Sequence, residues 1–226
     1  MRVSVLIPTI NEEARIAAAV EQALAAGGAE VLVIDAGSTD RTCQLAEQAG
    51  AIVWQAELGR ARQQNLGALH ASGDVLLFLH ADTSLDEGAV QQITSALADD
   101  QAQWGAFEQR LDASAWIYRW IERGNGLRVR YRGLAYGDQG LWLRRTFFER
   151  LGGFADVPLL EDLLLSQAAR KQAWPVLLPG PLRVSARRWQ RHGVVRQTLR
   201  NWSILLAHAC GASPERLAQR YRRHDR

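Results

Sequence analysis

The chain has 226 residues, of which 47% are hydrophobic and 23% are charged, which is typical of a folded globular protein with one large core. No apolar run approaches the roughly 18 residues that a membrane-spanning helix needs, so we expect no such helix. The two cysteines are far apart and favour reduced thiols in a cytosolic protein over a disulfide or a metal site. The N-terminal residues predict a strand rather than a signal peptide, so the expected location is the cytoplasm.

Charge is distributed unevenly along the sequence. Residues 1–113 carry 6 Lys or Arg against 16 Asp or Glu, whereas residues 114–226 carry 21 against 8. A basic C-terminal half can serve phosphate groups, an anionic membrane or nucleic acid, or it can be a solvated surface without a partner. The sequence contains no helix-turn-helix, zinc finger or other nucleic-acid-binding motif, so we expect no nucleic-acid partner.

The first hundred residues alternate between apolar runs of strand length and amphipathic stretches of helix length. We expect strands at Val3–Pro8, Glu30–Ile34, Ala51–Gln55 and Val75–Leu79. We expect helices from Asn11 to Gly27-Gly28, after Asp40 as far as Gly50, at Arg60–Ala71 and at Asp86–Ala98. Asn11 is the expected cap of the first helix. Repeated strand–helix units of this length predict an α/β fold with a parallel or mixed sheet.

After residue 100 the pattern changes. Trp104–Leu111 predicts a strand, and Ala113–Arg123 predicts an aromatic-rich helix that we expect to break at Gly124-Asn125-Gly126. The remaining expected elements are a loop and strand at Tyr136–Leu143, helices at Phe147–Leu151 and Leu159–Lys171, and two amphipathic helices separated at Gly211. We therefore expect one α/β domain at residues 1–190 and a helical C-terminal extension at residues 191–226.

The first helix of that extension, Val194–Ala209, is basic and amphipathic. It interleaves Arg196 and Arg200 with Trp202, Leu205 and Leu206. Such a helix can lie on an anionic membrane, pack on its own domain or pair with a second subunit. The sequence leaves these alternatives open, so both a peripheral position at the inner membrane face and a homodimer stay under consideration.

Polar residues follow three of the predicted strands at the point where each strand ends. They are Pro8-Thr9, Asp35 with the glycine and serine after it, and His80-Ala81-Asp82. In a parallel sheet these ends converge on one crevice, where ligands bind and where backbone N–H groups can receive phosphates. The sequence has neither a dinucleotide-binding G-x-G-x-x-G nor a P-loop. The Asp82 carboxylate suits Mg²⁺ or Mn²⁺, and an imidazole from His80 would favour Mn²⁺.

Five sequence blocks stand in a fixed order along the chain: Val5–Glu13, Val33–Asp40, Leu77–Thr83, Gly152–Phe154 and Glu161-Asp162. This order resembles glycosyltransferase family 2. Gly137–Gln139 and Ser185–Trp189 add to the match, which is greatest to a small bacterial subgroup of arsenosugar-biosynthesis-associated glycosyltransferases. The resemblance implies the GT-A fold, a Rossmann-like, mixed and mainly parallel sheet flanked by helices.

The resemblance also implies a reaction and roles for individual residues. The enzyme would be inverting and would move a sugar from a nucleoside diphosphate sugar, UDP-linked, to a hydroxyl of a small-molecule or lipid-phosphate acceptor. Asp82 would hold Mn²⁺ or Mg²⁺, Asp162 would be the general base, and Glu161 would contact the acceptor or tune the base. The expected donor-binding residues are Pro8, Thr9, Glu12, Asp35, Gly37, Ser38, Arg60, Arg62, His80 and Ala81. The expected acceptor-binding residues are Gly137, Asp138, Gln139, Arg188 and Trp189.

Two departures from the family pattern bear on these roles. Most members carry Asp-Asp where this chain has Asp35-Ala36, and the first carboxylate of their D-x-D motif is replaced here by His80. His80 would then contact the donor or support Asp82.

Two other classes of function stay open. A sugar-nucleotide nucleotidyltransferase normally has a glycine-rich loop with Arg or Lys directly after the first strand, and Pro8-Thr9-Ile10-Asn11 is not such a loop. A non-catalytic module that binds a sugar nucleotide or a membrane would need no general base.

Overall fold

The computed structural model describes the backbone of residues 1–225 and the side chains of residues 1–219, except those of residues 188, 191 and 192. An eight-stranded sheet with the order β3-β2-β1-β4-β7-β6-β8-β5 forms its centre. The strands are β1 (Val3–Thr9), β2 (Glu30–Asp35), β3 (Ile52–Gln55), β4 (Val75–Phe78), β5 (Thr83–Leu85), β6 (Trp104–Leu111), β7 (Leu141–Arg144) and β8 (Val176–Val184).

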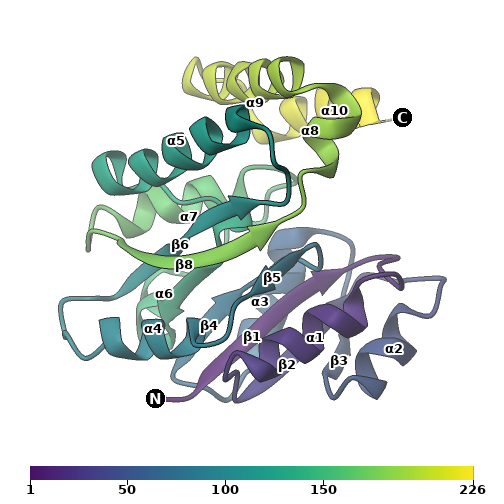
Figure 1. Ribbon diagram of the computed structural model, residues 1–226, viewed down its shortest axis with the longest axis vertical. Coiled ribbons are helices and arrows are strands. Elements are labelled where there is room, and N and C mark those ends of the chain that lie inside the picture. Colours follow the sequence, from purple (N-terminus) through teal and green to yellow (C-terminus); the bar gives the residue numbers. More distant parts are fainter. Residues whose placement is uncertain (226) are drawn as a thin grey trace.

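Helices cover both faces of this sheet (Figure 1). They are α1 (Ile16–Ala25), α2 (Thr42–Gln48), α3 (Arg60–His70), α4 (Ala89–Ala96), α5 (Trp116–Arg132), α6 (Arg145–Leu151), α7 (Glu161–Ala169), α8 (Arg187–His192), α9 (Val194–Ala209) and α10 (Pro214–Asp225), with a short 3-10 helix η1 (Gly137–Gln139) before β7.

The pairing of the strands is mixed and mainly parallel, as predicted. β3, β2, β1 and β4 form a parallel block. β7 runs antiparallel to both β4 and β6, β6 and β8 are parallel, and β5 closes the edge antiparallel to β8. The parallel block is therefore built from the repeated strand–helix units of the first hundred residues.

Side chains of β1 show why this block needs helices on both faces. Val5 and Ile7 enter one core layer together with Ile16 and Val20 of α1, whereas Leu6 enters the opposite layer. Successive side chains of a strand point to opposite faces, so an apolar residue at every position requires cover on both sides. α1 and α4 supply that cover on one face and α3, α6 and α7 on the other (Figure 1).

One predicted helix break was wrong, and three elements were not predicted. α5 does not break at Gly124-Asn125-Gly126 but continues to Arg132. β5, β8 and α8 were not predicted. β8 contains Pro179-Gly180-Pro181, which is typical of a turn, and its pairing with β6 is irregular opposite Phe107 and Gln109.

The C-terminal part of the chain forms α8, α9 and α10, separated at Gly193 and Gly211. These helices lie at the end of the molecule opposite the N-terminus (Figure 1). Among the described residues, no helix combines the length and the apolar character that crossing a bilayer would demand.

Candidate functional site

Three strand ends that we expected to converge do lie next to one another. β1 is flanked by β2 and β4, and all three run in the same direction. Pro8 is level with Ile34 and Thr9 with Asp35, so the loops after β1 and β2 leave the same edge of the sheet. Asp82 follows β4 at that edge.

The buried carboxylate of Asp35 holds the loop after β2 through hydrogen bonds. Its side chain is buried, and its carboxylate accepts hydrogen bonds from the backbone N–H groups of Gly37 (2.9 Å) and Ser38 (2.8 Å) and from the Ser38 hydroxyl. Burial alone would raise the pKa of Asp35, but the bonds from Ser38 and Gly37 together hold the pKa below its ordinary value. Asp35 thus fixes the loop as an ionised carboxylate, and its predicted contact with a donor stays a prediction.

The loop after β1 is joined to this loop by side-chain hydrogen bonds. Asn11 has a left-handed backbone (φ 52°), and its side-chain oxygen accepts the backbone N–H of Thr39 at 2.9 Å. The prediction that Asn11 caps the first helix is therefore wrong, because α1 begins only at Ile16. Glu12 pairs with Arg15 at 2.7 Å. Thr9 is buried beside Asp35.

A cavity of about 210 Å³ lies beyond the end of β4. It is lined by His80 and Asp82 after β4, Arg60 of α3, Tyr136 and Asp138 before β7, Leu159, Leu160, Glu161 and Asp162 around the start of α7, Val184 and Ser185 at the end of β8, Trp189 of α8, and Asn201, Ile204 and Leu205 of α9. We call it the α7 cavity. It brings together the predicted metal ligand and the predicted base, which lie far apart in the sequence. Asp35 is not among the residues that line it.

The backbone of α7 begins in a strained conformation directly before the two acidic residues of the cavity. Leu160 precedes the helix with φ 69° and ψ 20°, a left-handed conformation that is uncommon for a residue other than glycine. Such strain costs on the order of 1–3 kcal/mol and is concentrated at functional sites. It turns the chain so that Glu161 and Asp162 occupy the first turn of α7, where the helix dipole favours negative charge.

The Asp162 carboxylate is held by two backbone donors. The N–H of Gly137 donates to Oδ2 at 2.7 Å, and the N–H of Leu163 donates to Oδ1 at 2.7 Å. A Cβ atom added to Gly137 would lie 3.3 Å from Asp162 Oδ2 and 3.1 Å from His80 Nε2. The absence of a side chain at Gly137 therefore lets Asp162 and His80 approach the same point.

Glu161 is buried and lies 3.2 Å from an Arg60 guanidinium nitrogen. Burial raises the pKa of Glu161, and the neighbouring Asp162 charge raises it further, while Arg60 opposes both effects. Asp162 is more accessible than Glu161. A proton acceptor that must meet an incoming ligand is therefore better placed at Asp162 than at Glu161, which pairs with Arg60.

A half-buried arginine supports the loop that carries Gly137. Arg128 of α5 stacks on the Tyr136 ring at 3.6 Å and donates to the Gln139 side-chain oxygen at 2.5 Å. Burial lowers the pKa of Arg128, while the charges of Asp138 and Asp162 act in the opposite direction. Arg128 therefore lies under the η1 turn, which presents Tyr136 and Asp138 to the cavity.

The remaining predicted residues divide between this cavity and other positions. Arg60, His80, Asp138 and Trp189 line it. Arg62 instead forms exposed ion pairs with Asp156 (2.9 Å) and Glu57 (2.6 Å). The side chain of residue 188 lies outside the described part of the structure.

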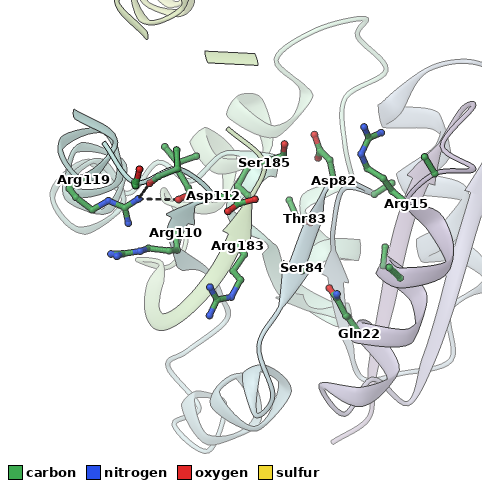
Figure 2. A pocket seen from close by; sticks show the side chains of 18 residues that line it. Arg15, Gln22, Asp82, Thr83, Ser84, Arg110, Asp112, Arg119, Arg183 and Ser185 are labelled. Atoms are coloured by element: carbon green, nitrogen blue, oxygen red, sulfur yellow. Dashed lines mark hydrogen bonds between the residues drawn. The ribbon is translucent and has the colours of Figure 1, made fainter. Parts of the chain in front are cut away.

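A second and larger cavity, of about 600 Å³, adjoins the first at Asp82. It lies between α1, β5 and the ends of β6 and β8, and Ala81 lines it together with Asp82. Figure 2 shows Asp82 between Ser185 and Arg15 in this cavity. Asp82 therefore stands where the two cavities meet.

Asp82 fits a hard divalent cation. Mg²⁺ is commonly held by one or two carboxylates together with substrate phosphates, and a carboxylate at the mouth of two cavities suits that mode. Within the described residues no group of three or more His, Cys, Asp or Glu side chains is arranged to bind a metal ion.

The sequence did not place Tyr136 or any residue of α9 in the predicted site. Asn201, Ile204 and Leu205 line the α7 cavity. Their spacing of three and four residues places them on one face of a helix, which is the signal that could have marked them. Which partner that face meets depends on how the chain folds back, and a local pattern does not carry that information.

Known proteins resemble this chain in sequence and in structure. Over 109 residues it is 31% identical to a 4,4'-diaponeurosporenoate glycosyltransferase of Staphylococcus haemolyticus. This match covers 44% of this chain and 29% of that protein. Over 194 residues it is 27% identical to the probable glycosyltransferase YdaM of Bacillus subtilis. This match covers 73% of this chain and 46% of that protein. The chain thus spans less than half the length of either relative.

Solved structures show the same fold. Staphylococcus aureus TarS, residues 1–349, in complex with UDP-GlcNAc superimposes with a TM-score of 0.67 at 18% identity, covering 82% of this chain and 58% of that one. The mannosyltransferase PcManGT of Pyrobaculum calidifontis, in complex with GDP-Man and Mn²⁺, gives a TM-score of 0.63 at 22% identity, covering 81% and 56%. This chain has the GT-A fold of these glycosyltransferases.

A family profile decides the assignment. The profile described as glycosyl transferase family 2 matches residues 4–152, a span that contains all but the first residue of β1, the whole of β2 to β7 and the ends of the three adjacent parallel strands. Because this span is well over half of the chain, the protein belongs to glycosyl transferase family 2.

Proposed function

We propose that the protein is an inverting, metal-dependent glycosyltransferase that moves a sugar from a UDP-linked donor to a hydroxyl acceptor. One observation carries this proposal: Asp82, at the end of a parallel strand, and Asp162, in the first turn of α7, line the same cavity. A cation ligand and a proton acceptor that face one space are the two groups that a one-step displacement at the anomeric carbon needs.

Asp162 takes the role of general base in this proposal. It receives the proton of the acceptor hydroxyl while that oxygen forms a bond to the anomeric carbon and the bond from that carbon to the diphosphate breaks. The N–H groups of Gly137 and Leu163 hold its carboxylate in one orientation, which reduces the entropy lost on reaching the reactive geometry. A divalent ion at Asp82 would stabilise the negative charge of the departing diphosphate.

The donor would occupy the edge formed by β1, β2 and β4 and extend towards Asp82. Arg60 lies at the start of α3 beside the α7 cavity, where its guanidinium can reach a diphosphate. The UDP-GlcNAc and GDP-Man complexes of structurally similar proteins support a nucleotide sugar, and the Mn²⁺ in one of them supports a divalent ion.

The acceptor would enter from the side of Asp138 and Trp189, which line the cavity. We propose a small amphiphilic molecule or a lipid phosphate as the acceptor. The relative named 4,4'-diaponeurosporenoate glycosyltransferase supports an apolar acceptor. Membership of the arsenosugar-associated subgroup stays a prediction.

Release of UDP from a UDP-sugar tests the proposal. We expect the wild-type protein to release UDP in Mn²⁺ and to stop when EDTA is added. Asp82→Asn should lose most of this activity, whereas Asp100→Asn, at an exposed acid away from both cavities, should keep it. Donor binding without release would instead indicate a binding module, and formation of pyrophosphate from a nucleoside triphosphate and a sugar phosphate would indicate a nucleotidyltransferase.

A further inference from the structure

Helix α9 has two faces with different surroundings. Its inner face carries Asn201, Ile204 and Leu205, which line the α7 cavity, and Gln197, which is buried. The helix therefore forms one wall of the candidate active site.

The outer face of α9 is an exposed apolar stripe. Val195, Leu199, Trp202 and Leu206 are each between 62% and 65% exposed. Their spacing of four, three and four residues places them along one side of the helix, opposite Gln197 and Ile204. Exposed apolar residues on the surface of a protein are normally scattered singly, whereas these four form a continuous stripe. A stripe of this kind marks a surface that a binding partner covers.

Charge in this region indicates what that partner is. Among the side chains that the structure describes between residues 187 and 219, four are arginines and one is acidic, and α9 itself carries Arg196 and Arg200 without any Asp or Glu. A second copy of the chain would place this positive surface against itself and be repelled. An anionic bilayer has the opposite charge, and it accepts tryptophan and leucine at the level of its headgroups.

We infer that α9 docks on an anionic lipid bilayer through Val195, Leu199, Trp202 and Leu206, with the exposed Arg196 contacting the headgroups. The docking itself does not depend on the proposed function, but its consequence for catalysis does. The cavity wall would lie one helix diameter, about 10–12 Å, from the bilayer surface. An amphiphilic acceptor could reach the cavity without leaving the membrane. α5, which exposes Trp116 and Trp120, lies at the same end of the molecule (Figure 1).

Vesicle flotation tests the inference with the full chain and without donor or acceptor. The probes are unilamellar vesicles of phosphatidylcholine alone and of phosphatidylcholine with about 30% phosphatidylglycerol. We expect binding to the anionic vesicles only, and we expect it to weaken as salt rises, because salt screens the attraction of arginine to the surface. The variant Leu199→Gln/Trp202→Gln should bind at least about tenfold more weakly, since two apolar side chains no longer enter the interface.

A matched control is available outside α9. Leu58 and Leu69 are 62% and 75% exposed and lie outside α9, so Leu58→Gln/Leu69→Gln should leave vesicle binding unchanged. The inference is overturned if the wild type does not bind anionic vesicles, if the α9 variant binds as well as the wild type, or if light scattering shows a dimer that the α9 variant converts to a monomer.

The α9 variant Leu199→Gln/Trp202→Gln separates this inference from the proposed function. Its substitutions face away from the α7 cavity, so UDP release in the absence of vesicles should equal that of the wild type. Vesicle binding without any UDP release would leave the docking surface standing and remove the proposed function. UDP release without vesicle binding would do the reverse.

Discussion

Asp162 illustrates how a single carboxylate is prepared for one role by its neighbours. Two backbone N–H groups hold it, and it faces a space that Asp82 also faces. We predict that Asp162→Asn lowers kcat by about 10²–10⁴-fold, because a positioned base contributes that much. The Kd for the UDP-sugar, measured by calorimetry, should stay within error of the wild-type value. A variant that binds donor poorly would contradict the assignment of Asp162 as base.

Glu161 should make stability depend on pH in a direction opposite to that of most acidic residues. Its pKa is raised in the folded protein, so between about pH 4.5 and that raised value the folded state binds the proton more tightly than the unfolded state does. This contribution to stability is present below about pH 4.5 and declines as pH rises through the window.

Replacing Glu161 with Gln removes the titrating group and tests this prediction. The Tm of Glu161→Gln relative to the wild type should therefore increase as pH rises from 4 to 8 in a thermal denaturation series. Glu57→Gln is a suitable control, because Glu57 is an exposed acid in an ion pair with Arg62. Parallel Tm-against-pH curves for Glu161→Gln and the wild type would show that the raised pKa is absent.

At the scale of the element, α5 shows what a glycine in a helix does and does not determine. The sequence predicted a break at Gly124, yet the helix continues, and a Cβ atom added at Gly124 would meet nothing within 4 Å. We predict that Gly124→Ala raises the free energy of unfolding by about 0.5–1 kcal/mol, because alanine loses less backbone entropy on folding.

Gly67 in the middle of α3 is the matched comparison. A Cβ atom there would lie 2.6 Å from Ile34 Cδ1 and 2.6 Å from Leu6 Cδ2, so α3 lies too close to the sheet for any side chain. Gly67→Ala should lower the free energy of unfolding by about 1–3 kcal/mol, as overpacking does. Urea denaturation of both variants measures the difference, and the same sign of change in both would contradict the account.

The elements that could be predicted from the sequence are those whose burial is local. β1, β2 and β4 are apolar at nearly every position, so their existence, their direction and their adjacent polar ends followed from the βα repeat. β8 could not be found in this way, because Pro179-Gly180-Pro181 lies within it and its partners β5 and β6 come from distant parts of the chain. The cavity wall formed by α9 was missed for the same reason.

At the scale of the whole molecule, the acidic half of the chain carries the edge where a diphosphate would bind. Residues 1–113 have an excess of ten acidic residues, and a field of that sign disfavours an anionic ligand. A divalent cation at Asp82 offsets this charge locally, so donor binding should require it. The basic C-terminal half, which surrounds the cavity from the other side through Trp189 and α9, favours anions over the same space.

A thermal-shift panel of UDP, GDP and their sugars, each with Mn²⁺ or with EDTA, measures this requirement. A ligand at a hundredfold excess over its Kd stabilises the folded state by about 2.7 kcal/mol. For a chain of this size that corresponds to a rise in Tm of about 5–10 °C. We expect the rise for UDP and Mn²⁺ together, a much smaller one in EDTA, and loss of the Mn²⁺-dependent part in Asp82→Asn. An equal rise in Tm in Mn²⁺ and in EDTA would show that the two halves of the protein bind the diphosphate without a cation. A larger rise in Tm for GDP than for UDP would show that the donor nucleotide is GDP.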